Sequence, residues 1–197
     1  MNKLLKTFVQ VLAIIALPTA AHADEALKEK ITSLDDTSFQ CIKQMTKVRG
    51  FYVDNVDPER LAETVAVAQK GQGEYPAGSV IQLVPSEVMV KHPKGTNSKT
   101  NDWEFFELKV SKAGSKVHVR GFEDVVNKFG GNCLDCHKKA RPEFDMVCEQ
   151  GHGCDPIPIT PQMTAVIQKT DPRCEMNYTL SKEEMAIAQQ LKALFGG

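Results

Sequence analysis

The chain has 197 residues, and its 24 Lys and Arg residues nearly balance its 25 Asp and Glu residues, which leaves a formal net charge of −1 at pH 7. This length is sufficient to bury one hydrophobic core. The balanced charge, without a basic block, argues against nucleic acid or an anionic membrane surface as a partner.

The first residues have the order of a secretory signal peptide. Lys3 and Lys6 precede an apolar stretch from Phe8 to Leu17, and the small-residue triplet Ala21-His22-Ala23 follows. The apolar stretch is too short for a membrane anchor, which needs about 20 residues. We predict that residues 1–23 are a signal peptide, that the protein is periplasmic, and that residues 24–197 form one domain with no membrane-spanning segment.

In chain order, the first elements are short helices and a strand. Apolar residues at helical spacing predict one or two short helices between Asp24 and Met45. Arg49 to Val53 is typical of a strand. Asp57-Pro58 favours the start of a helix, since Asp can cap and Pro is tolerated at the first helical position, and Gly71 favours its end.

The middle of the chain is rich in β-branched and aromatic residues. Gly78 to Val84 and Glu87 to Lys91 predict two strands, or one edge strand broken at Pro85. After a polar loop, Asp102 to Val110 and the following segment around Val117 to Val119 predict an antiparallel hairpin.

The last third is less regular. Gly130-Gly131 breaks the chain before a cysteine motif, and Pro156 to Pro161 predicts a wrapping loop. Ser181 to Phe195 predicts a final helix, because Ser181 and Glu184 have the spacing of a capping box. Its apolar residues form one stripe that should dock on the body of the domain.

The segment Cys133-Leu134-Asp135-Cys136-His137 is a C-x-x-C-H motif. One turn of helix can present both thiols to the vinyl groups of a haem while the adjacent His turns toward the iron. A thiol-disulfide redox pair, half of a zinc site and chance are the alternatives. A redox pair usually follows a strand in a thioredoxin-like unit, and a zinc site needs a further ligand pair. The sequence shows neither pattern. The motif predicts one covalent haem c, bound through Cys133 and Cys136 with His137 as an axial iron ligand.

Four cysteines remain, and an oxidising compartment favours their pairing. A bridge from Cys148 to Cys154 is the simplest interpretation of that short glycine-containing loop, and Cys41 would then pair with Cys174. Four cysteines allow three pairings, and the sequence does not choose among them. A zinc site built from Cys148, His152, Cys154 and Cys174 is the alternative.

The sixth coordination position of the iron has many candidate ligands and no outstanding one. A Met is more often a core residue than a ligand, and a lone His is more often hydrogen-bonded or exposed. The candidates are His92, His118, His152, Met45, Met89, Met146, Met163, Met176 and Met185.

Four pieces of the sequence resemble one family in their order and spacing. They are Gly50 to Asn55, Tyr75 to Ile81, Asp102 to Phe106, and Cys133 to His137 followed by Phe144 to Val147. Of these, the haem motif is the most specific. Over roughly residues 48–147 the chain resembles the cytochrome P-460 family and its relative cytochrome c prime beta, whereas the Cys- and Pro-rich extension 148–197 lies outside the resemblance.

The resemblance implies an α+β fold, with a twisted antiparallel β-sheet, flanking helices and a late haem helix. It implies that the haem lies against one face of the sheet under an apolar cover, with no protein ligand on the distal side. By strand alternation, one of Phe105 and Phe106 should face this pocket. Members often form homodimers through the sheet region, so a homodimer is a further expectation.

The leading functional hypothesis is electron transfer together with binding of nitric oxide or carbon monoxide at an open iron. One alternative is an oxidoreductase that acts on hydroxylamine or nitric oxide, and another is a six-coordinate pure electron carrier. The sequence does not identify the redox partner protein.

Hydroxylamine-oxidising members of the family carry a lysine crosslinked to the haem. Alignment of Gly78 to Leu83 with their strand pattern puts Leu83 at the position of that lysine, so we expect no crosslink. A different register, with an insertion across Pro85, would put Lys91 in this role.

Overall fold

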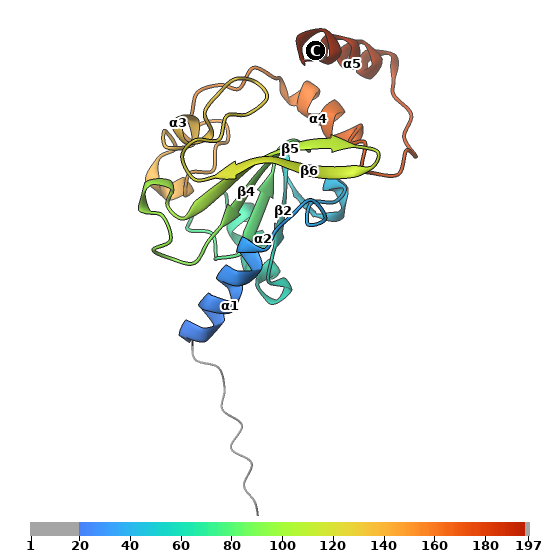
Figure 1. Ribbon diagram of the computed structural model, residues 1–197. Helices are drawn as coiled ribbons and strands as arrows, with labels where there is room; N and C mark the ends of the chain where they lie inside the picture. Colours follow the sequence, from blue (N-terminus) through green and yellow to red (C-terminus); the bar gives the residue numbers. More distant parts are fainter. Residues whose placement is uncertain (1–19, 196–197) are drawn as a thin grey trace, which may run out of the picture.

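The computed structural model describes residues 20–195, so most of the expected signal peptide lies outside the described residues. The fold is α+β and is built on one open, six-stranded antiparallel sheet with flanking helices (Figure 1). The strand order β1-β2-β3-β4-β5-β6 follows the chain, so each strand pairs with its neighbours in sequence. The expected fold class is confirmed.

The strands are β1 (Thr46–Val48), β2 (Phe51–Asn55), β3 (Ser79–Gln82), β4 (Glu87–Lys91), β5 (Trp103–Ser111) and β6 (Gly114–Gly121). The α-helices are α1 (Ala20–Thr32), α2 (Leu61–Lys70), α3 (Cys133–His137), α4 (Pro161–Lys169) and α5 (Lys182–Phe195). Short 3-10 turns occupy Ile42–Gln44, Pro58–Arg60, Ser98–Thr100 and Pro142–Phe144.

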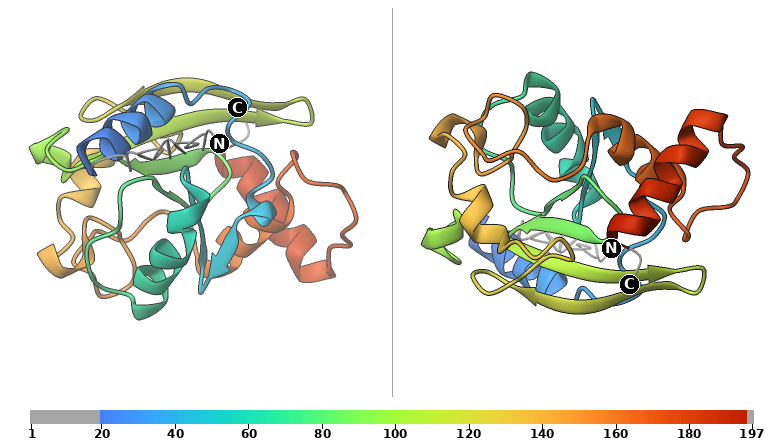
Figure 2. Two further views of the ribbon diagram at one scale, coloured as in Figure 1. Left: turned by 90° about the horizontal axis from the view of Figure 1, so that it is seen from below. Right: turned by 90° about the horizontal axis from the view of Figure 1, so that it is seen from above.

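The sheet is covered on both faces, because successive side chains of a strand point to opposite sides. One face packs against α1, where Leu27 and Ile31 contact Val90 and Phe106. The opposite face packs against α2 and the segment that follows α3. Figure 2 shows α1 and α2 on either side of β4. The C-x-x-C-H motif packs on this second face, which we call the α3 face.

Most of the expected elements are present, with shifted ends. The hairpin of β5 and β6 is confirmed, with a register shift between Glu107 and Leu108. The segment around Pro85 forms two strands, β3 and β4, rather than one broken strand. The helix after Asp57 begins as a 3-10 turn in which the Asp57 side chain accepts a hydrogen bond from the Glu59 amide, and α2 ends at Gly71, whose φ is 76°.

The C-terminal extension differs most from expectation. The loop predicted near Pro156 ends in α4, a helix that the sequence analysis missed, whose Thr160 side chain caps the Met163 amide. The capping box of α5 is confirmed, since the Glu184 amide donates to Ser181 Oγ at 3.1 Å and the Ser181 amide donates to Glu184 Oε2 at 2.8 Å.

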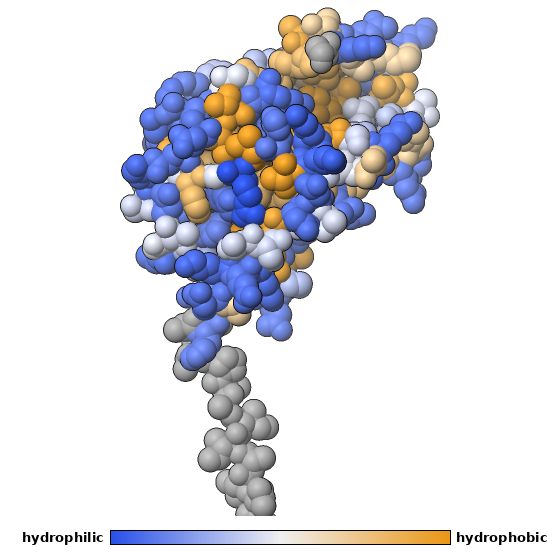
Figure 3. All heavy atoms as spheres, viewed as in Figure 1, coloured by the Kyte–Doolittle hydropathy of each residue, from blue (hydrophilic) through white to orange (hydrophobic). Residues whose placement is uncertain are grey.

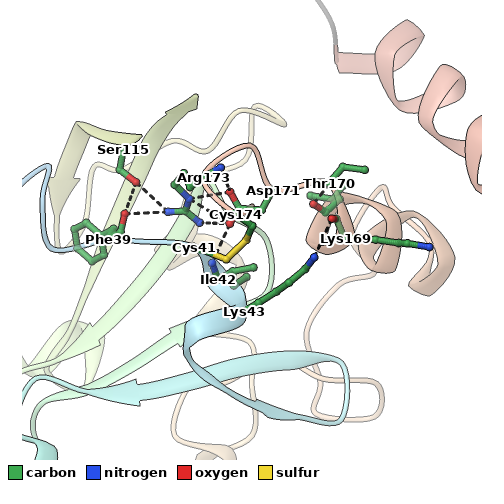
Figure 4. The surroundings of a disulfide bond; sticks show 11 residues. Phe39, Cys41, Ile42, Lys43, Ser115, Lys169, Thr170, Asp171, Arg173 and Cys174 are labelled. Atoms are coloured by element: carbon green, nitrogen blue, oxygen red, sulfur yellow. Dashed lines mark hydrogen bonds and ion pairs between the residues drawn. A yellow bond between two sulfur atoms is a disulfide. The ribbon is translucent and has the colours of Figure 1, made fainter. Parts of the chain in front are cut away.

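Of the two disulfides, one fastens this extension to the body and the other closes a loop within it. Cys41 pairs with Cys174 and Cys148 pairs with Cys154, at Cα–Cα distances of 4.7 and 5.7 Å. Beside the first bridge, the Asp171 carboxylate pairs with Arg173 and accepts a hydrogen bond from the Ile42 amide (Figure 4). Within residues 20–195, no helix is long and apolar enough to cross a bilayer.

A shallow apolar groove of about 220 Å³ lies between α4, α5 and one end of the sheet, and Figure 3 shows apolar side chains gathered beneath α5. Val110, Val166, Ile167 and Leu191 are among its lining residues. No residue of the C-x-x-C-H motif lines this groove.

Candidate functional site

The cysteine motif forms a short helix that is fixed from its N-terminal side. The Asn132 side chain caps α3 by accepting a hydrogen bond from the Asp135 amide at 2.9 Å, and its Nδ2 donates to the Glu123 carbonyl at 2.8 Å. The Cys133 amide donates to the Val125 carbonyl. Asn is a preferred residue at this position of a helix. The motif therefore starts from a defined place beside the sheet.

Cys133 and Cys136 keep free thiols, because the other four cysteines are consumed by the two disulfides. Burial raises the pKa of the Cys133 thiol to about 12, and burial also raises the pKa of Cys136. A catalytic C-x-x-C pair needs the opposite, a thiol pKa that is lowered toward neutrality. The electrostatics of the two thiols thus disfavour the redox-pair alternative.

His137 is held in one orientation by the backbone. Its Nδ1 donates to the Met146 carbonyl at 2.7 Å, since a carbonyl can only accept. Burial lowers the pKa of His137, which favours the neutral ring. In the neutral ring with hydrogen on Nδ1, the lone pair is on Nε2, the form in which an imidazole binds a metal while its other nitrogen donates to a carbonyl.

The Met146 carbonyl belongs to an unusual turn. The Val147 amide donates to the Phe144 carbonyl at 2.8 Å, and the two central residues, Asp145 and Met146, both have positive φ angles of 47° and 62°. This is the backbone of a type I′ turn, in which Gly, Asn and Asp are the usual central residues. Met is an unfavourable choice there, so the turn requires support from outside.

Asp145 provides that support through a buried network. Lys91 Nζ lies 2.7 and 3.0 Å from the two carboxylate oxygens of Asp145, and the side chains of this ion pair are 3% and 2% exposed. The Tyr75 amide donates to Asp145 Oδ2, and Trp103 Nε1 donates to the Asp145 carbonyl. The Asn101 side chain also donates to Asp145 Oδ1, and Lys91 donates to the Asn101 carbonyl.

The sheet presents three cross-strand pairs on the α3 face. They are Lys91 with Trp103, Met89 with Phe105, and Glu87 with Glu107. The first pair holds Asp145 and the second is apolar. The third is acidic, and Glu87 Oε1 and Glu107 Oε2 are buried without a hydrogen-bond partner in the described part of the chain.

The acidic pair is shifted toward its protonated form. Burial raises the pKa of Glu87 to about 7, with the Glu107 charge as a second cause, and burial raises the pKa of Glu107 to about 7. Lys128 acts on both carboxyls in the opposite direction. Their charges also help to raise the pKa of Cys133, so these carboxyls lie near the thiol.

The two phenylalanines that were expected near the haem lie on opposite faces of the sheet, and Phe105 is the one on the face of the C-x-x-C-H motif. Phe105 belongs to the same core as Cys133 and Leu134, and its ring centroid is 5.3 Å from that of His137. Phe106 faces the α1 side, where it contacts Phe39. The inclusion of Phe106 among the site residues is therefore corrected, since strand alternation puts it on the opposite face.

The candidate sixth ligands separate by position. His92 is bound by Glu104, His118 is exposed, and His152 donates to the Val147 carbonyl. Met176 and Met185 are exposed. Met89 is buried in the same core as Phe105, and Met146 packs against that core.

The zinc alternative is wrong for this structure. Cys148 is bound to Cys154, and Cys174 is bound to Cys41, so none of the three offers a thiolate. In the described ranges, Cys41, Asp171 and Cys174 bring three atoms of metal-binding types together, two sulfurs and one carboxylate oxygen. The disulfide and the Arg173 ion pair occupy these atoms, so we assign no metal to them.

The donor set on the α3 face suits haem c. Two free thiols have two residues between them, and they are followed by an imidazole whose Nε2 is left for a metal. Lys91 and Asp145 were not predicted as supports of this imidazole, because they are 54 positions apart in the sequence. The positive charge of Lys91 within a buried β-strand was the available signal.

Comparison of the chain with protein-family models, with curated proteins and with solved structures found no match in any of the three.

Proposed function

We propose that the protein is an exported, periplasmic c-type cytochrome with one haem, bound by thioether bonds to Cys133 and Cys136 and ligated by His137. The observation that carries this proposal is the hydrogen bond from His137 Nδ1 to the Met146 carbonyl, beside the two free thiols. A redox C-x-x-C site would not need an imidazole with a fixed tautomer. Haem ligation does, because a metal-binding His is normally oriented by a partner on its other nitrogen.

The chain's own groups divide the remaining work. A bound haem would supply an iron that changes oxidation state by one electron. His137 Nε2 would hold the iron, and the Met146 carbonyl fixes the plane of the imidazole. Phe105 and the neighbouring strand residues exclude water from this face of the sheet.

Electron transfer and binding of a neutral diatomic gas, nitric oxide or carbon monoxide, are the proposed activities, and the apolar side chains of Met89 and Phe105 on this face of the sheet support them. Apolar walls offer few hydrogen bonds, so they favour a neutral ligand over a strongly hydrated one. Hydroxylamine oxidation through a lysine crosslink has less support, because Lys91 is committed to Asp145. We also propose that the protein exchanges electrons with a partner protein and that it forms a homodimer.

A pure electron carrier is the second candidate, and Met89 favours it. This Met is buried on the face that carries Phe105, whereas the exposed Met residues cannot reach an iron there. Ligation by its thioether would give a low-spin, six-coordinate haem.

The first test is covalent attachment. In a host competent in cytochrome c maturation, the denatured wild-type protein should keep haem on a gel, and the double variant Cys133→Ala/Cys136→Ala should lose it. Cys148→Ala/Cys154→Ala is the matched control, because it removes two cysteines of similar position and should keep the haem. Haem that can be extracted from the wild type would refute the proposal.

The second test separates the two candidates. High-spin absorption bands in the ferrous protein, unchanged by Met89→Leu, indicate an open iron that should bind carbon monoxide. Low-spin bands that become high-spin in Met89→Leu indicate the electron carrier.

A further inference from the structure

The turn that carries the Met146 carbonyl does not follow from its local sequence. Both central residues, Asp145 and Met146, adopt the left-handed conformation, which L-residues other than Gly avoid. The position of Met146 in such a turn is normally occupied by Gly. Local preference therefore works against the backbone geometry that His137 depends on.

Contacts from two strands and one loop oppose this preference. Lys91 in β4, Trp103 in β5 and the Asn101 side chain all bind Asp145, and Lys91 contacts both of its carboxylate oxygens. Every one of these contacts ends on the residue adjacent to Met146. Because Lys91 is the only cation in this set, it carries the electrostatic compensation of the buried carboxylate.

We propose that the Lys91–Asp145 ion pair is the positioning device of the haem-binding histidine: by locking the turn from Phe144 to Val147, it sets the strength of the hydrogen bond from His137 Nδ1 to the Met146 carbonyl and thereby the reduction potential of the iron. The inference rests on the proposed function. Lys91 and Asp145 are positioning residues, since neither is placed in contact with the haem.

The direction of the effect follows from the donor. A strong hydrogen bond from Nδ1 makes the imidazole a better electron donor, which stabilises the ferric iron and lowers the reduction potential. Loss of Lys91 leaves the Asp145 carboxylate buried without a cation, and the turn then rearranges. The hydrogen bond weakens, the potential rises, and the iron–histidine stretching frequency of the ferrous five-coordinate protein falls.

The experiment compares Lys91→Met with Arg173→Met. Arg173 belongs to a second buried ion pair, with Asp171, whose side chains are 2% and 0% exposed, and it lies beside the Cys41–Cys174 disulfide (Figure 4). Both variants should lower the melting temperature. Only Lys91→Met should raise the reduction potential and lower the stretching frequency. Equal potentials in the two variants and the wild type would overturn the inference.

Two further variants keep the test decisive. If Lys91→Met does not accumulate, Asp145→Asn removes the same ion pair while keeping an oxygen for the Tyr75 amide, and it should shift the potential in the same direction. In the background of Met146→Gly, whose turn needs less support, Lys91→Met should shift the potential less. An equal shift in both backgrounds would mean that Lys91 acts on the iron directly and would contradict the inference.

The same measurements distinguish a failure of the proposed function from a failure of the positioning role. A wild-type protein without covalent haem refutes both the function and the positioning role. A wild type that keeps its haem, with a potential insensitive to Lys91→Met and Asp145→Asn, refutes the positioning role alone.

Discussion

Glu87 and Glu107 face each other across β4 and β5, each with a carboxyl oxygen that has no hydrogen-bond partner in the described residues. Burial is the main cause of the rise in both pKa values, from 4.5 to about 7. At a pH between these two pKa values, the two carboxyls are ionised in the unfolded chain and protonated in the folded chain. The contribution of the protonated pair to the free energy of unfolding is therefore fully present below about pH 4.5 and is lost as the pH rises through 7.

We accordingly expect Glu107→Gln to flatten the fall in melting temperature between pH 5 and pH 8 and to be more stable than the wild type at pH 8. Calorimetry of the haem-loaded protein across this range measures the effect. Glu59→Gln is the control, because Glu59 is exposed and should leave the pH profile unchanged. A Glu107→Gln profile parallel to that of the wild type would contradict the assignment.

At this scale the sequence predicted the residues of the local motif and missed its supports. Cys133, Cys136 and His137 are recognisable because one helical turn brings them together. Lys91 and Asp145 meet only after β4 has paired with β5 and the chain has returned over the sheet. Such long-range pairing has no fixed spacing in sequence.

At the scale of elements, α5 lies at the surface of the domain, since none of its residues is buried. Its start is fixed by the capping box of Ser181 and Glu184, and Glu184 also pairs with Lys169 of α4 at 2.8 Å. At its other end the Phe195 ring packs on Phe129.

Ser181→Ala should therefore destabilise α5 locally, by about 1 kcal/mol, the usual cost of losing an N-cap side chain. Hydrogen exchange should speed up in the first turn of α5 and remain unchanged in β5. Ser181→Thr, which retains a capping oxygen, should behave like the wild type. Faster exchange throughout the sheet would show that the helix is coupled to the core.

The strands of the hairpin were easier to predict than helix α4. Strand periodicity and turn residues give the hairpin of β5 and β6 directly. Helix α4 was missed because Pro161 was grouped with the preceding prolines as loop, whereas Pro at the first helical position with Thr160 before it also favours a helix start. Whether this segment forms a loop or a helix depends on its contacts with the rest of the domain. These contacts include the hydrogen bonds that Gln168 of α4 donates to the Gly50 and Leu83 carbonyls.

At the scale of the whole molecule, the two disulfides should contribute unequally. Cys41 and Cys174 are separated by 133 residues, and Cys148 and Cys154 by 6. On the chain-entropy model the long bridge stabilises by about 5 kcal/mol and the short bridge by about 2 kcal/mol.

Urea unfolding of Cys41→Ala/Cys174→Ala and Cys148→Ala/Cys154→Ala tests this order, with the larger loss in the first double variant. Haem absorbance should persist in both variants. Equal losses would indicate that strain or contacts around the bridges outweigh the loop length.

The overall fold was predictable in class, because an ordered set of strand patterns with flanking helices leaves few arrangements other than an antiparallel sheet covered on its faces. The pairing of the four structural cysteines was among three arrangements that the sequence left open, and the structure selects the one in which Cys41 reaches Cys174.

That connectivity bears on how the protein matures. Cys41 is far upstream of its partner, and Cys133 and Cys136 lie between the two. If the chain is exported from its N-terminal end into an oxidising compartment, as proposed, Cys41 would encounter these two thiols before Cys174 is exposed, and mispaired bridges would compete with cofactor attachment. Cys148 and Cys154 are near each other in sequence, so their disulfide would form early and remove both from the mispairing reactions. In the proposed c-type cytochrome, capture of Cys133 and Cys136 by thioether bonds, which thiol exchange cannot reverse, would leave Cys174 as the remaining partner of Cys41, and the cofactor would direct the correct closure of the chain around it.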